Sequence, residues 1–293
     1  MNNVVKKSAV ITGASSGIGE ASVQRLLQVG WRVFATVRKA EDADRLRRSE
    51  GVANLVPVIM DVQERSTISA AAEQVSSQLG EQGLDGLVNV AGIGMARPLE
   101  YASAEDLHEI FEVNVFGQMA VTQAFLPFIR KAHGRIVNIT SVGAHIAIPF
   151  GGLLNASKSA FSLLSDTLRL ELHPFGIRVA TVEPGAIKTP AVDKTLGHIE
   201  SVIGQLPARG VSQYADLLRN FARRAYAREN NGSSPDVVAR AVEHALTARR
   251  PRIRYQAGKD AKLLVTLPRI LPDWLLDAIR LKGLGLPSGF GVS

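Results

Sequence analysis

The sequence predicts an α/β protein built on a doubly wound parallel sheet, and three observations support this fold class. Six short runs rich in β-branched residues alternate with longer amphipathic stretches, and a glycine-rich turn follows the first run. Near-continuous apolar strands of this kind are covered by helices on both faces, and right-handed crossovers wind the chain outward from the centre of the sheet. The runs cover residues 8–12, 32–37, 55–59, 86–90, 135–140 and 178–182.

The helices between these strands are predicted from apolar spacing and from signals at their ends. Gly30 and Gly80 are placed to stop the first two. Ser103 is placed as the N-cap of the third, with Asp106 three residues later as a variant of the capping box. The fourth ends before Pro174. The predicted helices span 18–29, 65–79, 103–131 and 153–173.

The alternation of strands and helices fades after residue 182. A further helix is predicted to begin at Pro235. In the leucine-rich tail, Pro268 and Pro272 argue against one long membrane-surface helix, so we expect short helices over the substrate cleft in preference to membrane contact. The sequence predicts one domain over 1–293, with a core at about 8–190, a substrate loop or lid at about 188–232 and a C-terminal helical elaboration at about 233–293.

Composition narrows the class of protein. The 293 residues are 46% hydrophobic and 21% charged and include no cysteine, which excludes a disordered chain, a fibrous protein and a disulfide-stabilised fold. No apolar run approaches the roughly 18 residues of a membrane span, and the first residues resemble no secretory signal. The net charge of +7 comes from small basic groups without interleaved aromatic residues, so we expect no nucleic-acid partner. We expect a cytoplasmic protein.

The glycine-rich turn carries the first signal of function. It reads Thr12-Gly13-Ala14-Ser15-Ser16-Gly17-Ile18-Gly19 and joins the first strand to the first helix. Gly13 permits the turn, Gly17 lets the backbone approach a phosphate, and Gly19 allows the helix to pack closely on the sheet. The helix N-terminus then offers unpaired N–H groups to an anion. This context predicts a dinucleotide-binding turn.

Further motifs follow this turn in order. They are Asp61-Val62, Asn89-Val90-Ala91-Gly92, Asn114 within the long central helix, Ser141 after Asn138-Ile139-Thr140, and Pro184-Gly185 before Thr189. Together with the glycine turn they resemble the short-chain dehydrogenase/reductase family over about residues 8–190. Residues 33–38 and 150–161 resemble the branch of that family that contains retinol and 17β-hydroxysteroid dehydrogenases.

The resemblance implies a Rossmann-type fold, a nicotinamide dinucleotide cofactor and oxidoreductase activity. It implies that Ser141 hydrogen-bonds the substrate carbonyl, that Lys158 binds the nicotinamide ribose and that Asn114 positions a water relay. The residues that it assigns to cofactor binding are Gly13, Ser15, Ser16, Gly17, Ile18, Gly19, Asp61, Val62, Asn89, Ala91, Gly92, Lys158, Pro184, Gly185, Ile187 and Thr189.

The end of the second strand indicates which nicotinamide cofactor is bound. An NAD-preferring fold of this kind carries an acidic residue there, which binds the ribose 2′-hydroxyl. This chain has Val37 at that position, followed by Arg38 and Lys39. No carboxylate would repel a 2′-phosphate, and the arginine offers it charge-assisted hydrogen bonds. The sequence therefore predicts NADP(H).

The catalytic centre departs from the family pattern. The family places Tyr-x-x-x-Lys on one helix face, and the tyrosine transfers the proton. Here Lys158 fits, but Leu154 occupies the tyrosine position. Losing a positioned acid or base removes about 10²–10⁴ in rate. Three explanations stay open: an inactivated variant of an ordinary reductase, a natural member with another proton source such as water relayed by Lys158, or a protein that keeps the cofactor pocket for another purpose.

The predicted substrate is a lipophilic ketone or alcohol, because the residues around the expected pocket are mostly apolar. They are Ile93, Met95, His145, Ile146, Ile148, Phe150 and Leu154. No cluster has the spacing of a metal site. Two alternatives are a non-redox cyclase or isomerase built on the same pocket and a protein that binds the cofactor without turnover.

A homodimer or homotetramer is expected. In the family, the helices at about 103–131 and 153–173 pair across a two-fold axis. We expect Phe161, Leu164 and Leu168 to point outward from the second of these helices and to need such a partner.

Overall fold

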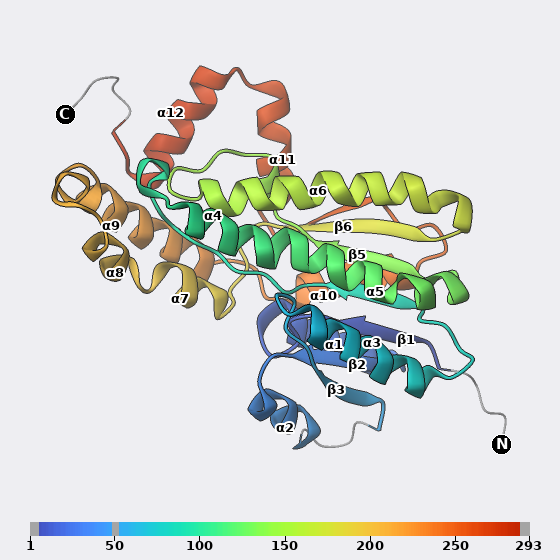
Figure 1. Ribbon diagram of the computed structural model, residues 1–293. Coiled ribbons are helices and arrows are strands. Elements are labelled where there is room, and N and C mark those ends of the chain that lie inside the picture. The colour runs from blue at the N-terminus through green and yellow to red at the C-terminus, as the bar shows by residue number, and fades with distance from the viewer. Residues whose placement is uncertain (1–5, 49–52, 288–293) are drawn as a thin grey trace.

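A computed structural model describes residues 6–48 and 53–287. The first five residues, used above to argue against a secretory signal, and the last six of the C-terminal elaboration lie outside the described residues. A parallel sheet of seven strands forms the centre of the molecule, in the order β3-β2-β1-β4-β5-β6-β7 (Figure 1). The strands are β1 (Ser8–Ile11), β2 (Arg32–Val37), β3 (Leu55–Ile59), β4 (Gly86–Asn89), β5 (Arg135–Ile139), β6 (Arg178–Pro184) and β7 (Arg254–Ala257).

Helices cover both faces of this sheet, as its buried apolar strands require. One face packs against α1, α2 and α10, and the other against α3, α5 and α6. Their bounds are α1 (Gly17–Gln28), α2 (Ala40–Arg48), α3 (Arg65–Leu79), α5 (Gly117–Ala132), α6 (Gly152–Leu172) and α10 (Asp236–Thr247). The structure confirms the predicted doubly wound, Rossmann-type single domain.

The strand order reverses between β1 and β4. The chain first moves from β1 outward to β2 and β3, and then returns to place β4 on the other side of β1. Crossovers leave in opposite directions at this point, so a crevice opens beyond the carboxyl ends of β1 and β4. The fold therefore places the glycine-rich turn, which follows β1, at the position where such sheets bind ligands.

The long central helix differs from the single helix predicted over 103–131. It is divided into α4 (Ala104–Phe111), a π-helical segment (Glu112–Phe116) and α5. The predicted capping box is present, because the Ser103 side chain accepts from the Asp106 N–H and the Asp106 carboxylate accepts from the Ser103 N–H, each at 3.0 Å. The π-helical segment carries Asn114, as π-bulges at functional sites often carry polar residues.

The outward face of α6 differs from the prediction. Phe161 is buried, Leu164 is half-buried, and Leu168 is half-buried against the core. The exposed apolar residues of this helix are Leu163 and Leu170 instead. The prediction failed because this helix is apolar on more than one side, so its sequence does not show which side faces outward.

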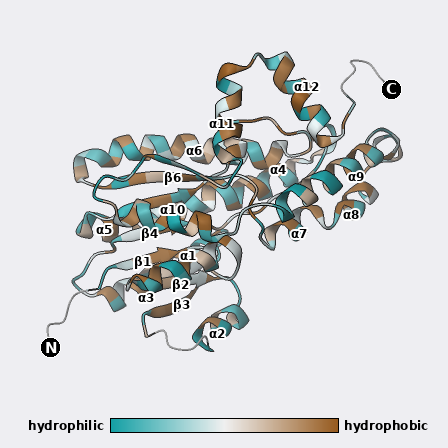
Figure 2. Ribbon diagram, turned by 180° about the vertical axis from the view of Figure 1, so that it is seen from behind, coloured by the Kyte–Doolittle hydropathy of each residue, from teal (hydrophilic) through white to brown (hydrophobic). Residues whose placement is uncertain are grey.

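Apart from α10 and β7, the elements after β6 are helices that lie beyond the sheet (Figure 1). The predicted lid consists of α7 (Ala191–Leu196), α8 (Ile199–Gly204) and α9 (Ala208–Asn230). The proline-interrupted tail forms two short helices, α11 (Ala261–Ile270) and α12 (Asp273–Leu284), which stand apart from the sheet layers in both views (Figures 1 and 2). Within the described ranges, no helix combines the length and apolarity needed to cross a membrane.

Candidate active site

The glycine-rich turn forms one wall of the crevice between β1 and β4. Gly13 has a φ of 62°, in the region that favours glycine. A Cβ on Gly19 would lie 2.1 Å from the Gly13 carbonyl oxygen, so only glycine lets α1 start this close to the turn. The Thr12 hydroxyl accepts the Val90 N–H at 2.8 Å and the Ala91 N–H at 2.9 Å. These bonds fix the turn against the end of β4.

The crevice is a cleft of about 620 Å³, and α1 begins at its wall. The unpaired N–H groups of that helix end provide an anion site. The structure brings together thirteen of the predicted cofactor residues along the cleft: Gly13, Ser15, Ser16, Gly17, Ile18, Gly19, Arg38, Lys39, Asp61, Val62, Ala91, Gly92 and Thr189.

Other lining residues were missed by the sequence reasoning. They are Thr36, Asp42, Met60, Val90, Val113, Pro190, Ala191 and Lys194. Several adjoin a recognised motif in the chain, as Met60 adjoins Asp61 and Pro190 adjoins Thr189. That adjacency is the signal that could have found them. Lys194 carried no such signal, because α7 brings it to the cleft only in the folded chain.

The end of β2 gives the cleft a cationic wall. Val37 is buried at the last position of the strand, and Arg38 and Lys39 follow it as exposed, cleft-lining residues. Asp42 also lines the cleft, but its carboxylate is 3.1 Å from the Arg45 guanidinium. The position next to the strand end is therefore positive, which suits a phosphate group.

Five predicted cofactor residues do not line the cleft, and one of them is Lys158, which is described below. The amide of Asn89 donates to Thr122 Oγ1 at 3.0 Å and to Asn138 Oδ1 at 2.8 Å, inside the protein. Ile187 is buried in the core, and Pro184 ends β6. A Cβ on Gly185 would lie 2.1 Å from Asp260 Oδ1, so this glycine makes room for a carboxylate that accepts the Ala186 N–H at 3.2 Å.

Lys158 and Asn114 meet behind Gly92 in the cleft wall. A Cβ on Gly92 would lie 3.4 Å from Lys158 Nζ and 3.0 Å from Asn114 Oδ1. Lys158 is buried, its ammonium donates to the Ile139 carbonyl at 3.0 Å, and burial lowers its pKa to about 8. Asn114 accepts the Ile93 N–H and donates to the Ile93 carbonyl, both at 2.9 Å. Asn114 thus clamps the Ile93 turn.

Ser141 stands at the start of a short 3₁₀ turn, Val142–Ala144, directly after β5. Its Oγ accepts the Gly143 N–H at 3.0 Å, which leaves the hydroxyl proton free to be donated to a ligand. A Cβ on Gly143 would lie 2.5 Å from Asn155 Oδ1, so the first turn of α6 packs tightly on this segment. Leu154 is half-buried in that first turn, one helical turn before Lys158.

A second cavity of about 510 Å³ has a mainly apolar lining. It is lined by Leu99, Ala147, Ile148, Pro149, Phe150, Gly152, Asn155, Asp277, Arg280 and Leu281. Among the predicted substrate residues, Ile148 and Phe150 lie here and Ile93 lies in the cofactor cleft. Phe150, at a φ of 62°, stacks edge-on against Phe221 of α9 with ring centroids 5.4 Å apart. Four residues predicted around the substrate line neither cavity: Met95, His145, Ile146 and Leu154.

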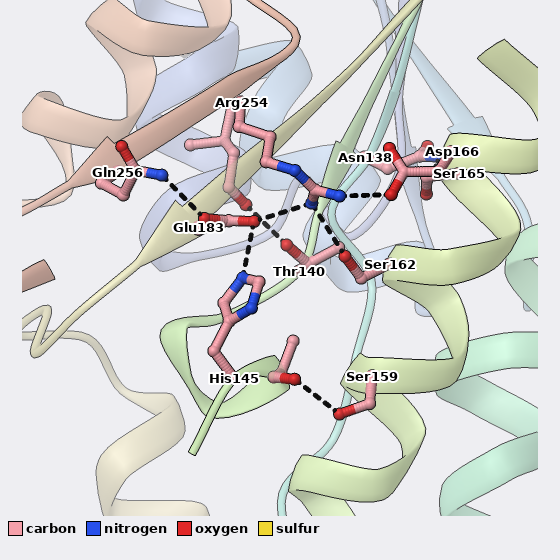
Figure 3. Close-up of polar contacts among 12 residues, drawn as sticks. Asn138, Thr140, His145, Ser159, Ser162, Ser165, Asp166, Glu183, Arg254 and Gln256 are labelled. Atoms are coloured by element: carbon pink, nitrogen blue, oxygen red, sulfur yellow. Dashed lines mark hydrogen bonds and ion pairs between the residues drawn. The ribbon is translucent and has the colours of Figure 1, made fainter. Parts of the chain in front are cut away.

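His145 belongs to a buried charged cluster instead (Figure 3). Its Nε2 lies 2.9 Å from a carboxylate oxygen of Glu183, which is fully buried at the end of β6. Arg254 donates to the same oxygen at 3.1 Å and also pairs with Asp166 of α6. Burial would raise the pKa of Glu183, but the His145 hydrogen bond, together with Gln256 and Arg254, holds this pKa below 4.5. No pattern in the sequence predicts this cluster, because its members are far apart in the chain.

The comparison with known proteins agrees with this geometry. The family model described as short chain dehydrogenase matches residues 7–215. Rat (Rattus norvegicus) 17-beta-hydroxysteroid dehydrogenase type 6 is 37% identical over 287 residues, covering 93% of this chain and 87% of the relative. Human (Homo sapiens) retinol dehydrogenase 5 is 37% identical over 278 residues, covering 92% and 86%.

Solved structures show the same fold. A short chain dehydrogenase from Burkholderia cenocepacia in complex with NADP superposes with a TM-score of 0.71 at 26% identity, covering 94% of this chain and 98% of that chain. A 3-ketoacyl-(acyl-carrier-protein) reductase from Brucella melitensis complexed with NADH gives 0.68 at 27% identity, covering 85% and 93%. The chain belongs to the short-chain dehydrogenase/reductase family of oxidoreductases.

Proposed function

We propose that this protein is an NADP(H)-dependent oxidoreductase that acts on a lipophilic ketone or alcohol. The observation that carries the cofactor choice is the pair of exposed cations, Arg38 and Lys39, on the cleft wall directly after β2. An acidic side chain at the strand end would repel a 2′-phosphate, and this chain has the buried Val37 there. The guanidinium of Arg38 can hydrogen-bond a phosphate in two places.

The rest of the cleft fits a dinucleotide. The glycines of the 13–19 turn let the backbone approach a pyrophosphate, and the start of α1 presents N–H groups to it. NADP(H), when bound, would supply the hydride. Lys158 lies directly behind Gly92, which supports a contact between its ammonium and the nicotinamide end of the cofactor.

Two polar groups are available to a substrate carbonyl. The Ser141 hydroxyl can donate to the carbonyl oxygen, because its own acceptor site is occupied by the Gly143 N–H. Leu154 has no proton to give. Lys158 shares its helix face and has a pKa of about 8, so its ammonium is the group we propose as the proton source, directly or through water.

The apolar second cavity supports a lipophilic substrate. Its wall residue Asn155 packs against Gly143, which in turn contacts Ser141. A hydrophobic body held by Ile148 and Phe150 could therefore present a carbonyl toward the Ser141 turn.

Turnover of NADPH with a panel of lipophilic ketones tests this function. We expect loss of NADPH absorbance matched by one reduced product per cofactor, identified by mass spectrometry. A product formed without NADPH consumption would replace the redox function with an isomerase or cyclase. Tight NADPH binding with no product from any ketone, and none from alcohols with NADP⁺, would indicate a cofactor-binding protein without turnover.

A further inference from the structure

The helices α11 and α12 expose large apolar side chains where they meet. Leu263 and Ile270 of α11 are 60% and 68% exposed, and Trp274 at the start of α12 is 72% exposed. Leu267 and Leu271 lie between them and are half-buried. We call these five residues the hairpin tip. An exposed apolar group of this size, centred on a tryptophan, marks an interaction surface.

The hairpin tip faces away from the body of the protein. Ala261 and Val265 hold the inner side of α11 against Val142 and the turn after Ser141. Leu263, Leu267 and Ile270 follow each other at helical spacing on another side of the same helix. Both ribbon views show the two helices outside the sheet layers, and the hydropathy colouring shows apolar residues along them (Figures 1 and 2).

Cationic side chains accompany this apolar surface. The segment 261–284 contains Lys262, Arg269, Arg280 and Lys282. Its acidic residues are Asp273 and Asp277, and the Asp277 carboxylate is 3.3 Å from Arg280. In the part of the chain that the structure describes, neither Lys262 nor Arg269 has an ion-pair partner, and both are exposed. Apolar residues flanked by free cations complement a bilayer that contains anionic lipids.

We propose that the hairpin tip docks on the surface of an anionic lipid bilayer, with Trp274 and Ile270 at the level of the lipid headgroups. Trp is suited to this depth because its ring is apolar and its N–H is polar. The two prolines rule out one long interfacial helix, but the exposed residues of the two short helices meet at their junction. This proposal therefore favours the membrane contact that the sequence analysis had ranked second.

The same hairpin borders the apolar cavity. Asp277, Arg280 and Leu281 of α12 line that cavity, while Trp274 is at the other end of the helix. The proposed function places a lipophilic substrate in this cavity. Docking would then bring the cavity close to the lipid bilayer, in which such a substrate dissolves. This step rests on the proposed function, whereas docking itself does not.

Tryptophan fluorescence tests docking directly, because the chain has two tryptophans and Trp31 is only 4% exposed. We expect the emission of Trp274 to shift to shorter wavelength with vesicles of phosphatidylcholine and phosphatidylglycerol, and the protein to float with them. Trp274→Phe should abolish the shift, and Trp31→Phe should keep it. No shift and no flotation with these vesicles would overturn the proposal.

Substitutions at the tip separate docking from non-specific adsorption. Leu263→Ser with Ile270→Ser should weaken vesicle binding by at least about tenfold, since each change removes an apolar side chain that docking would bury in the bilayer. Lys262→Gln with Arg269→Gln should weaken it by about fivefold for each charge, and added salt should reduce that difference. Val29→Ser with Ile253→Ser, at 42% and 50% exposure outside α11 and α12, is the matched control and should bind normally.

Two outcomes would contradict bilayer docking even if vesicles bind. Equal loss in the control, Val29→Ser with Ile253→Ser, would show adsorption through any apolar patch. A lipid-free dimer that the tip substitutions dissociate, seen by sedimentation velocity, would make a second copy of the chain the occupant. Vesicle binding is measured without cofactor, so failure of the redox function leaves this result standing.

Discussion

We predict that the residue at position 154 decides how fast this protein reduces a ketone. Ser141, Lys158 and the cofactor cleft do not need a phenol at position 154 to keep their geometry. Leu154→Tyr should therefore raise NADPH-dependent ketone reduction by about 10²–10⁴ and change NADPH affinity by no more than a few-fold. Initial rates and a fluorescence titration measure the two effects.

Leu163→Tyr, the same change at an exposed position of α6, is the control and should leave the rate unchanged. A large gain at position 154 alone would indicate an inactivated reductase. An efficient wild type that gains nothing would indicate another acid. Absence of turnover in both forms would contradict a redox function.

Lys158 should impose a pH dependence on activity near pH 8. If its ammonium supplies the proton, kcat/KM for reduction should be constant below pH 8 and fall above it, because burial lowers the pKa of Lys158 to about 8. A rate that stays flat from pH 7 to pH 10 would exclude Lys158 as the acid.

The same buried ammonium should affect stability. Its folded-state pKa of about 8 lies below the ordinary 10.5, so the folded protein binds fewer protons than the unfolded chain between these values. The free energy of unfolding should therefore rise across pH 8 to 10.5, by about 3 kcal/mol in all. Denaturant titrations of wild type and Lys158→Met measure it, and the rise should be missing from the variant.

The positions of individual site residues could be predicted where a motif determines the backbone path. They could be predicted less well where they depend on which hydrogen-bond partner a side chain has. The glycine turn, Arg38 and Gly92 lie in the cleft, because strand ends and tight turns place them there. Asn89 also stands at a strand end, but its amide donates a hydrogen bond to Thr122 inside the protein. His145 turns to Glu183, a partner from another strand that no local pattern reveals.

At the scale of elements, the partly buried charges between α6, β6 and β7 join the segment after Ser141 to the sheet edge. Arg254 connects Glu183 to Asp166, so Arg254→Met would leave two carboxylates with fewer partners (Figure 3). We expect a loss of about 2 kcal/mol in the free energy of unfolding. Arg219→Met, which breaks exposed pairs with Glu200 and Asp216, should leave the free energy of unfolding almost unchanged, because water screens these charges.

Denaturant unfolding of both variants measures these losses. Equal losses would show that the cluster adds no more than a surface ion pair. Because the pKa of Glu183 is held below 4.5, its contribution should be present above pH 4.5 and lost as the pH falls through the lowered pKa.

Element prediction succeeded for strands with continuous apolar runs and failed for the others. Six strands were found because each is a run of buried, mostly β-branched residues. β7 was missed because it has only four residues, one of them the exposed Gln256, and it pairs at the edge of the sheet. The π-helical segment around Asn114 has the same apolar spacing as a regular helix, so the sequence could not reveal it.

At the scale of the whole molecule, we propose assembly through the outer face of α6. Leu163 and Leu170 are exposed on this helix, and Leu107 and Phe116 are exposed on the neighbouring central helix. A homodimer or homotetramer would bury them. Leu163→Asp with Leu170→Asp should give a monomer by sedimentation velocity at micromolar concentration, whereas Ile270→Asp on α11 should not. A monomeric wild type would contradict this assembly.

The central claim is that the cleft of this family member binds NADP(H), and calorimetric titration of NADPH and NADH into the protein tests it most directly. We predict tighter binding of NADPH. Arg38→Asp should weaken NADPH by about 10- to 100-fold and reverse the preference, because a carboxylate would face the 2′-phosphate. Arg47→Asp makes the same charge change on α2 outside the cleft lining and should keep the preference. Equal affinities in the wild type, tighter NADH, or no binding of either would contradict the account.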